Sequence, residues 1–233
     1  MRSLLSFTVQ VLLASPLLAE SPRDWFEPLT GHRVVRLSRE PGRASLYFHQ
    51  NAYTAEGDKL IISTPSGLAT VNLTNYNLEI VVPQNGYGMR GSSGMEVGRK
   101  TRHVYYSARA DTGTVIRATH LDTKATRDVV KLPFFAALNG VTADEKMIVG
   151  TLRERGTDRR SMKFYAADVR TGDVKFFNAS TNWLNHGQCS PTDPTMLLYC
   201  HEGTWHDVDR VWTVRIANGA CTLTLPVGRY IVE

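Results

Sequence analysis

The 233-residue sequence contains few cysteines and lacks the cysteine spacings of common metal sites. Its three cysteines, Cys189, Cys200 and Cys221, are an odd number, which does not make the disulfide framework of a small secreted domain. It has no Cys-x-x-Cys pair and no other zinc-binding spacing. A bond between Cys189 and Cys200 is conceivable in an oxidising compartment. We expect instead that both are small apolar residues of neighbouring strands.

Signatures of several large enzyme classes are also missing. The sequence has no Gly-x-Ser-x-Gly nucleophile motif, no phosphate-binding P-loop and no dinucleotide-binding glycine fingerprint. No pair of carboxylates stands out for glycoside hydrolysis, since the separation of Glu202 and Asp207 is not fixed by the sequence. These absences set aside the corresponding hydrolase, nucleotide-hydrolysing and dehydrogenase chemistries.

Basic residues exceed acidic ones, but they are not concentrated. The formal net charge is +5, which favours anionic partners without naming one. The Lys and Arg residues are scattered, with only short pairs such as Arg99-Lys100 and Arg159-Arg160. A nucleic-acid-binding face would need a denser basic patch, so we expect no nucleic-acid partner.

Long apolar runs are absent beyond the N-terminus. Residues 1–19 (MRSLLSFTVQVLLASPLLA) place Arg2 before an apolar stretch that ends at the small residue Ala19. This pattern predicts a secretory signal peptide cleaved after Ala19. Interrupting polar residues make the run shorter than the roughly 20 apolar residues of a membrane span, which argues against an anchor or a buried first helix. We expect a periplasmic or extracellular mature protein, residues 20–233, with no membrane association.

The remaining sequence repeats with a period of 47–48 residues. Short polar turns follow hydrophobic runs at Leu73, Leu121, Val169 and Ile216, in steps of 48, 48 and 47 residues. Each period holds several short β-like segments, which is the sequence pattern of a β-propeller blade. A β-sandwich would show frequent turns but no such register. The sequence therefore predicts an all-β propeller with about four blades.

Four strands are predicted in each blade. The predicted inner strands are Ala44–Tyr53, Gly94–Gly98, Phe134–Thr142 and His186–Cys189. The other predicted strands are Lys59–Thr64, Leu68–Leu73, Leu78–Val82, His103–Ala108, Val115–Leu121, Arg127–Leu132, Lys146–Thr151, Met162–Val169, Val174–Asn178, Thr195–His201, Arg210–Ile216 and Cys221–Leu225.

The candidate site residues concentrate in the last predicted blade. His201 follows an apolar run at a predicted strand end, and Arg210 opens the next strand after a short loop that contains His206. This spacing lets His201, His206 and Arg210 converge on one rim. His186, and His49 in an aromatic and amide-rich inner strand, are further candidate substrate contacts. For each of these residues the alternative is a hydrogen-bonded packing role.

Three motifs in this region resemble one family, the oligogalacturonate lyases, which are pectin-degrading seven-bladed propellers. The motifs are Trp183-Leu184-Asn185-His186, Cys200-His201-Glu202-Gly203 and Val208-Asp209-Arg210-Val211-Trp212. Two earlier segments also look like the first blade of the family, namely Thr30–Leu37 and Tyr47–Asn51. The resemblance runs from about Trp25 to Arg215.

The resemblance implies a β-elimination on short galacturonide chains. A base removes the proton next to the uronate carboxylate, and the glycosidic oxygen leaves from the adjacent carbon. Arg210 matches the catalytic arginine of the family, and its guanidinium beside the carboxylate would stabilise the enolate-like charge that develops. The family also uses a histidine base and a manganese ion held by histidines and a glutamine.

The sequence departs from the family at its C-terminal side. The base of the family lies in a His-Glu-Phe motif of the following blade, its metal ligands lie later still, and residues 216–233 contain no histidine. The chain is therefore expected to hold about four of the seven blades and to lack manganese ligands and lyase activity by itself. The alternative hypothesis is a non-catalytic propeller module that binds carbohydrate or protein.

Overall fold

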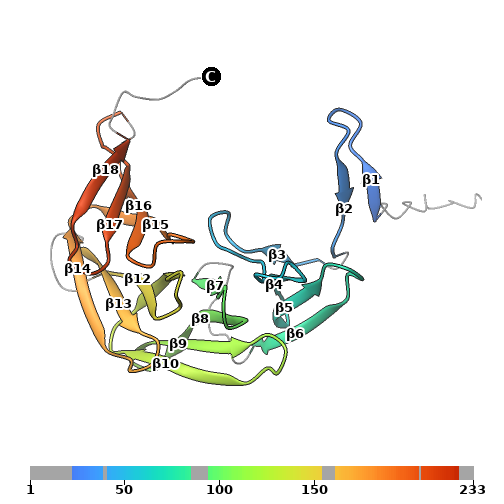
Figure 1. The fold of residues 1–233 in the computed structure, drawn as a ribbon, viewed down its shortest axis with the longest axis horizontal. Coiled ribbons are helices and arrows are strands. Elements are labelled where there is room, and N and C mark those ends of the chain that lie inside the picture. Colours follow the sequence, from blue (N-terminus) through green and yellow to red (C-terminus); the bar gives the residue numbers. More distant parts are fainter. Residues whose placement is uncertain (1–22, 39–40, 85–93, 154–160, 205, 226–233) are drawn as a thin grey trace, which may run out of the picture. The chain divides into compact units, whose positions relative to one another are not determined.

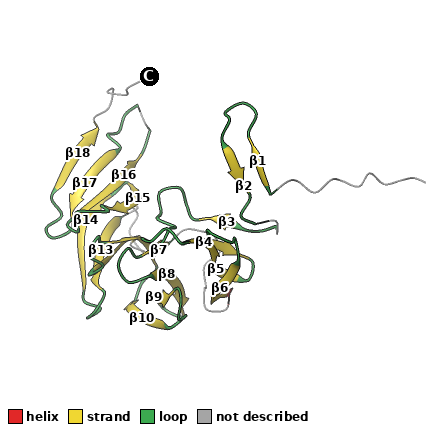
Figure 2. Ribbon diagram, turned by 45° about the vertical axis from the view of Figure 1, so that its right-hand side comes forward, coloured by secondary structure: helices red, strands yellow, loops and turns green. Residues whose placement is uncertain are grey.

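The computed structural model describes residues 23–38, 41–84, 94–153, 161–204 and 206–225. These residues form strands, turns and loops with no α-helix, as Figure 2 shows. Within this part of the chain, no helix is long and apolar enough to cross a membrane. The predicted signal peptide, residues 1–19, lies outside the described residues.

The chain divides into two compact units at Arg39. In the first unit, β1 (Asp24–Phe26) and β2 (Arg33–Val35) form an antiparallel hairpin in which Trp25 lies opposite Val34. An ion pair between Arg33 and Asp24 links the two strands at the surface.

The second unit contains four antiparallel sheets of four strands each, and Figure 1 shows them in succession along the chain. The first two sheets are β3 (Ala44–Ser45), β4 (Lys59–Thr64), β5 (Gly67–Asn72) and β6 (Leu78–Pro83), then β7 (Met95–Val97), β8 (His103–Ala110), β9 (Gly113–His120) and β10 (Thr126–Leu132). The last two are β11 (Ala136–Val141), β12 (Met147–Arg153), β13 (Met162–Asp168) and β14 (Val174–Ser180), then β15 (Trp183–Cys189), β16 (Met196–Glu202), β17 (Val211–Arg215) and β18 (Cys221–Leu225). The prediction of four propeller blades is confirmed.

The first predicted inner strand is wrong over most of its length. Only Ala44 and Ser45 pair with β4, and Tyr53 forms a single bridge with Leu60. Between them the chain turns, because the Gln50 amide donates to the carbonyl of Tyr47 at 2.8 Å and the Gln50 side chain accepts from the Tyr47 amide at 3.1 Å. These local bonds replace the strand ladder and place His49 in a turn.

The repeated turn owes its period to a shared hydrogen-bond pattern. Asn72 and Asp168 each accept backbone amides two and three residues ahead through the side-chain oxygen, at 2.8–3.1 Å. The His120 ring does the same through Nδ1 at 3.2 Å. These side chains mimic a backbone turn, and so they set the connection between the third and fourth strands of three blades.

Apolar side chains fill the space between neighbouring sheets. Tyr105 and Ile116 of the second sheet pack with Leu138 and Ile148 of the third. A second core forms between the third and fourth sheets, and its largest buried members include Phe164 and Leu184. Because both faces of a blade are covered, the middle strands read as nearly continuous apolar runs rather than alternating ones.

Strand order fixes which loops share an end of the blades. In an antiparallel blade, the start of the inner strand lies at the same end as the loop between the second and third strands. We call this the rim end; in the fourth blade it holds the start of β15 and the loop 203–210. We call the opposite end the turn end. It holds the connections from the inner to the second strand of each blade, at residues 54–58, 98–102, 142–146 and 190–195.

Candidate functional site

Glu202 joins a histidine and an arginine at the rim end of the fourth blade. Glu202 is the last residue of β16, and Arg210 lies just before β17 rather than inside it as predicted. A backbone bond from the His201 amide to the Arg210 carbonyl, 2.8 Å long, holds the two segments together. The Arg210 guanidinium donates to the Glu202 carboxylate and to the Gly203 carbonyl, and His186 Nε2 lies 3.2 Å from Glu202 Oε1. We call His186, Glu202 and Arg210 the rim triad.

His186 lies in a β-bulge, and the bulge sets the direction of its side chain. β15 starts at Trp183, three residues earlier than predicted, and its register with β16 shifts between Asn185 and Gln188. His186 lies within this bulge and has a φ of 50°, which is costly for a residue with a side chain. Bulges commonly redirect side chains beside functional sites. His186 Nδ1 is buried and has no hydrogen-bond partner among the described residues.

Aromatic rings from the segment after β3 surround His186. The Tyr47 ring stacks on the imidazole at 5.7 Å with 7° between the planes, and His49 meets it edge-on at 5.4 Å. Phe48 lies 5.4 Å away and is 78% exposed. Burial, together with repulsion from His186, lowers the pKa of His49 and so favours its neutral form. The structure thus brings His49 and His186 together from opposite ends of the sequence.

The other two candidate histidines have different surroundings. His201 Nε2 lies 2.9 Å from Asn182 Nδ2 and 3.4 Å from Ser180 Oγ. Because neighbouring residues of a strand point to opposite faces, the His201 ring lies away from Glu202. His206 is an exposed residue of the loop 203–210. Glu202 therefore connects Arg210 with His186, whereas His201 contacts Ser180 and the turn before β15.

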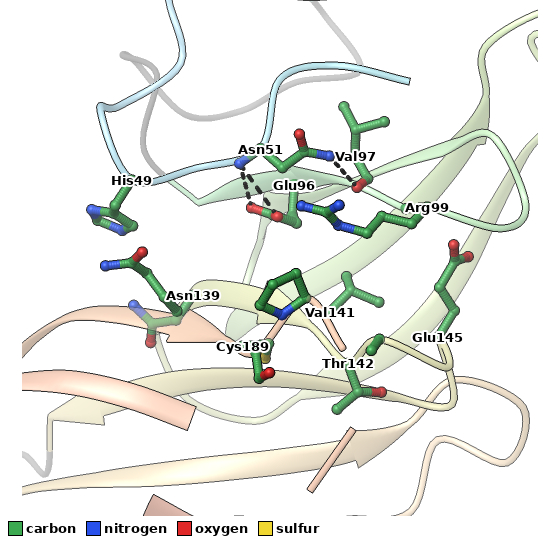
Figure 3. Close-up of a pocket in the computed structure, with 15 residues that line it drawn as sticks. His49, Asn51, Glu96, Val97, Arg99, Asn139, Val141, Thr142, Glu145 and Cys189 are labelled. Carbon is green, nitrogen blue, oxygen red and sulfur yellow. Dashed lines mark hydrogen bonds between the residues drawn. The ribbon is translucent and has the colours of Figure 1, made fainter. Parts of the chain in front are cut away.

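A polar cavity at the turn end was not predicted from the sequence. It has a volume of about 170 Å³, and the side chains of Asn51, Glu96, Asn139 and Gln188 line it, one from each blade (Figure 3). The backbone amide of Asn51 donates to both carboxyl oxygens of Glu96 at 3.3 Å. Burial of Glu96 raises its pKa to about 8, so this carboxyl is largely protonated at neutral pH. The sequence does contain a sign of this cavity, because Glu96 is a charged residue between two apolar ones, Met95 and Val97, in a predicted inner strand.

Glu145, in the turn 142–146, also lines this polar cavity. Its backbone has a φ of 56°, yet the residue is only 7% exposed. Its carboxylate reaches the second blade, where it accepts from the amides of Lys100 and Thr101, from the Thr101 hydroxyl and from Tyr105 Oη at 3.3 Å. These bonds offset the backbone strain and join the second blade to the third.

The three cysteines are free thiols. Cys189 and Cys200 lie on the neighbouring strands β15 and β16, as expected. The described residues contain no group of three or more His, Cys, Asp or Glu that could hold a metal ion. They therefore do not fit the manganese ion that the family resemblance implies.

Comparison with solved structures supports the fold. The chain superposes on an oligogalacturonate lyase in complex with manganese with a TM-score of 0.71 and 20% identity, covering 86% of this chain and 58% of that one. An oligogalacturonate lyase from Vibrio parahaemolyticus gives a TM-score of 0.68 at 19% identity, over 85% and 57%. TolB from Acinetobacter baumannii gives 0.59 at 16%, over 84% and 46%.

These likenesses establish a β-propeller fold. The chain spans less than two thirds of the length of each of these three proteins. No family model matches the sequence, and no curated protein sequence matches it significantly.

Proposed function

We propose that this chain is part of a secreted, lyase-like β-propeller that binds short galacturonide chains at the rim triad. The observation that carries the proposal is the Glu202 carboxylate, which holds the Arg210 guanidinium on one oxygen and His186 on the other. The likeness to oligogalacturonate lyases supports the same substrate class. The predicted signal peptide supports action outside the cytoplasm.

Arg210 is the group we assign to the uronate carboxylate. A guanidinium presents its N–H donors in a planar fork that matches the two oxygens of a carboxylate. The Arg210 side chain is 31% exposed, and Glu202 and Gly203 hold its guanidinium. A carboxylate bound to it would have its charge stabilised as a proton leaves the adjacent carbon, which is the unfavourable step of β-elimination.

Binding is the property we assign to the described residues, whereas elimination belongs to the whole protein. His186, held by Glu202 and stacked on Tyr47, would contact the same sugar. The His49 ring packs edge-on against the His186 ring and would help to hold it in place. His201, directly before Glu202, and His206, in the loop between Glu202 and Arg210, are proposed as flanking contacts because of these positions in the sequence.

Calorimetry with digalacturonate tests the proposal. Arg210→Ala should weaken binding by about 30- to 160-fold, since a charge-assisted hydrogen-bonded pair contributes roughly 2–3 kcal/mol. Arg215→Ala is the matched control, because Arg215 is an exposed arginine on the next strand that bonds Thr195. Unchanged affinity with a lowered melting temperature would instead assign Arg210 to bracing the loop. Release of unsaturated uronate, followed by ultraviolet absorbance, distinguishes a lyase from a binding module.

A further inference from the structure

The polar cavity lined by Asn51, Glu96, Asn139 and Gln188, which we call the turn-end cavity, contains a side chain that no described residue engages. Gln188 is only partly buried, and its side-chain amide has no hydrogen-bond partner within the described residues. A primary amide presents two N–H donors and a carbonyl oxygen. These groups are available to a ligand that enters the cavity.

Arg99 brings a positive charge to the same cavity. Figure 3 shows its guanidinium pointing towards the Glu96 carboxyl, yet the two side chains form no ion pair, and Arg99 has no acidic partner in the described part of the chain. Attraction to Arg99 lowers the pKa of Glu96, but burial outweighs this effect and raises it to about 8. The cavity therefore combines a free guanidinium with a carboxyl that carries a proton to donate.

The remaining titratable groups of the lining do not change this balance. The Glu145 carboxylate is held by its donors on the second blade, namely the Lys100 and Thr101 amides and two hydroxyl groups. Burial raises the pKa of the Cys189 thiol, which keeps it neutral, and the neutral form of His49 is favoured. Among the described residues that line the cavity, Arg99 is thus the one charged group without a partner.

We propose that the turn-end cavity binds a small carboxylate anion of the size of acetate or propionate. The two carboxylate oxygens accept from the planar fork of Arg99, from the Glu96 hydroxyl and from the Gln188 amide. The volume of about 170 Å³ suits a ligand of up to about six heavy atoms, since a cavity of about 150 Å³ can hold benzene. This site lies at the opposite end of the blades from the rim triad, and the inference does not rest on the proposed function.

Calorimetry with acetate on the full chain tests the site. Acetate should bind with a dissociation constant in the millimolar range, and acetamide, its neutral isostere, should bind at least about 10-fold more weakly. Arg99→Gln should weaken acetate binding by about 10-fold, and Gln188→Leu by about fivefold through one lost hydrogen bond. Because Arg210 could also attract acetate, the same comparison is made in the Arg210→Ala protein, where binding at the turn end should persist.

Lys100→Gln is the matched control for Arg99→Gln. It removes a neighbouring positive charge from an exposed side chain that does not line the cavity, and it keeps the backbone amide that binds Glu145. Its acetate affinity should equal that of the wild type. An equal loss in both variants would show that acetate responds only to net charge, and would overturn the proposal.

The pH dependence tests the donor role of Glu96. With a pKa of about 8, its protonated fraction falls about 10-fold between pH 7 and pH 9, so acetate affinity should fall by the same factor. Glu96→Gln keeps an N–H donor at this position and should bind acetate equally at both pH values. Equal affinity for acetate and acetamide, or the absence of saturable acetate binding, would overturn the site. Arg99→Gln should leave digalacturonate affinity unchanged; a loss would show that the cavity takes a uronate carboxylate, and would contradict a separate site for small anions.

Discussion

Two carboxyl groups at opposite ends of the blades have contrasting partners. Glu202, at the rim end, is about a quarter exposed and contacts both Arg210 and His186. Glu96, at the turn end, accepts from the backbone amide of Asn51, and burial raises its pKa to about 8. An ionised carboxylate can orient an arginine for an anionic ligand, whereas a protonated one cannot. The fold therefore places an ion-paired carboxylate at the rim end and a buried, protonated carboxyl at the turn end.

A second contrast concerns the turns at residues 54–58 and 142–146. Gly57 and Glu145 occupy the same place, since each amide donates to the carbonyl of a threonine three residues earlier. Both have positive φ, at 69° and 56°. Glycine adopts this conformation without strain, so a glutamate there indicates that its side chain has a role. That role is to bind the neighbouring blade.

The largest expected effect is on this contact between blades. Glu145→Ala should lower the free energy of unfolding by about 3 kcal/mol, because the partly buried donors of Lys100 and Thr101 and the buried hydroxyl of Tyr105 lose their acceptor. Denaturant unfolding measures the change. Glu79→Ala is the control, since Glu79 is exposed and pairs only at the surface with Lys124, and it should change stability by less than about 1 kcal/mol. Similar losses in both variants would show that Glu145 does not join the blades.

A smaller effect, of about 2 kcal/mol between pH 6 and pH 7.5, should come from Glu96. Its folded pKa of about 8 exceeds its ordinary value of 4.5, so the folded state holds a proton that the unfolded state releases. Stability should therefore fall as pH rises through this window, by at most about 1.4 kcal/mol per pH unit. Glu96→Gln, which mimics the protonated form, should match the wild type near pH 4 and exceed it at pH 8. Parallel stability curves for the two proteins would contradict the raised pKa.

The sequence predicts the blades better than it predicts the site. Periodic turns at residues such as Asn72 and Asp168 depend on local hydrogen bonds, so their register is visible in the chain. The sequence did not predict the turn at His49, because Gln50 forms hydrogen bonds with Tyr47 instead of continuing the strand β3. The links between His186, Glu202 and Arg210 depend on a bulge, and a bulge leaves no regular pattern in the sequence.

The smallest expected effect separates charge from geometry at the rim triad. Arg210→Lys keeps the positive charge but loses the planar fork, so it should weaken digalacturonate binding by roughly 1 kcal/mol, about fivefold. Its unfolding free energy should change by less than about 0.5 kcal/mol, because the side chain is partly exposed and its pairing with Glu202 is screened by solvent.

Arg210→Lys is best compared with Glu96→Gln, since the two variants should affect different properties. Glu96→Gln should alter the pH dependence of stability and leave sugar affinity unchanged, whereas Arg210→Lys should do the reverse. Calorimetry and denaturant unfolding on both proteins measure the two properties side by side. If Arg210→Lys destabilises the fold as much as it weakens binding, Arg210 is a structural partner of Glu202. The rim end would then have a structural role like that of Glu145 at the turn end, and the proposed contrast between a sugar-binding end and an end that does not bind sugar would be wrong.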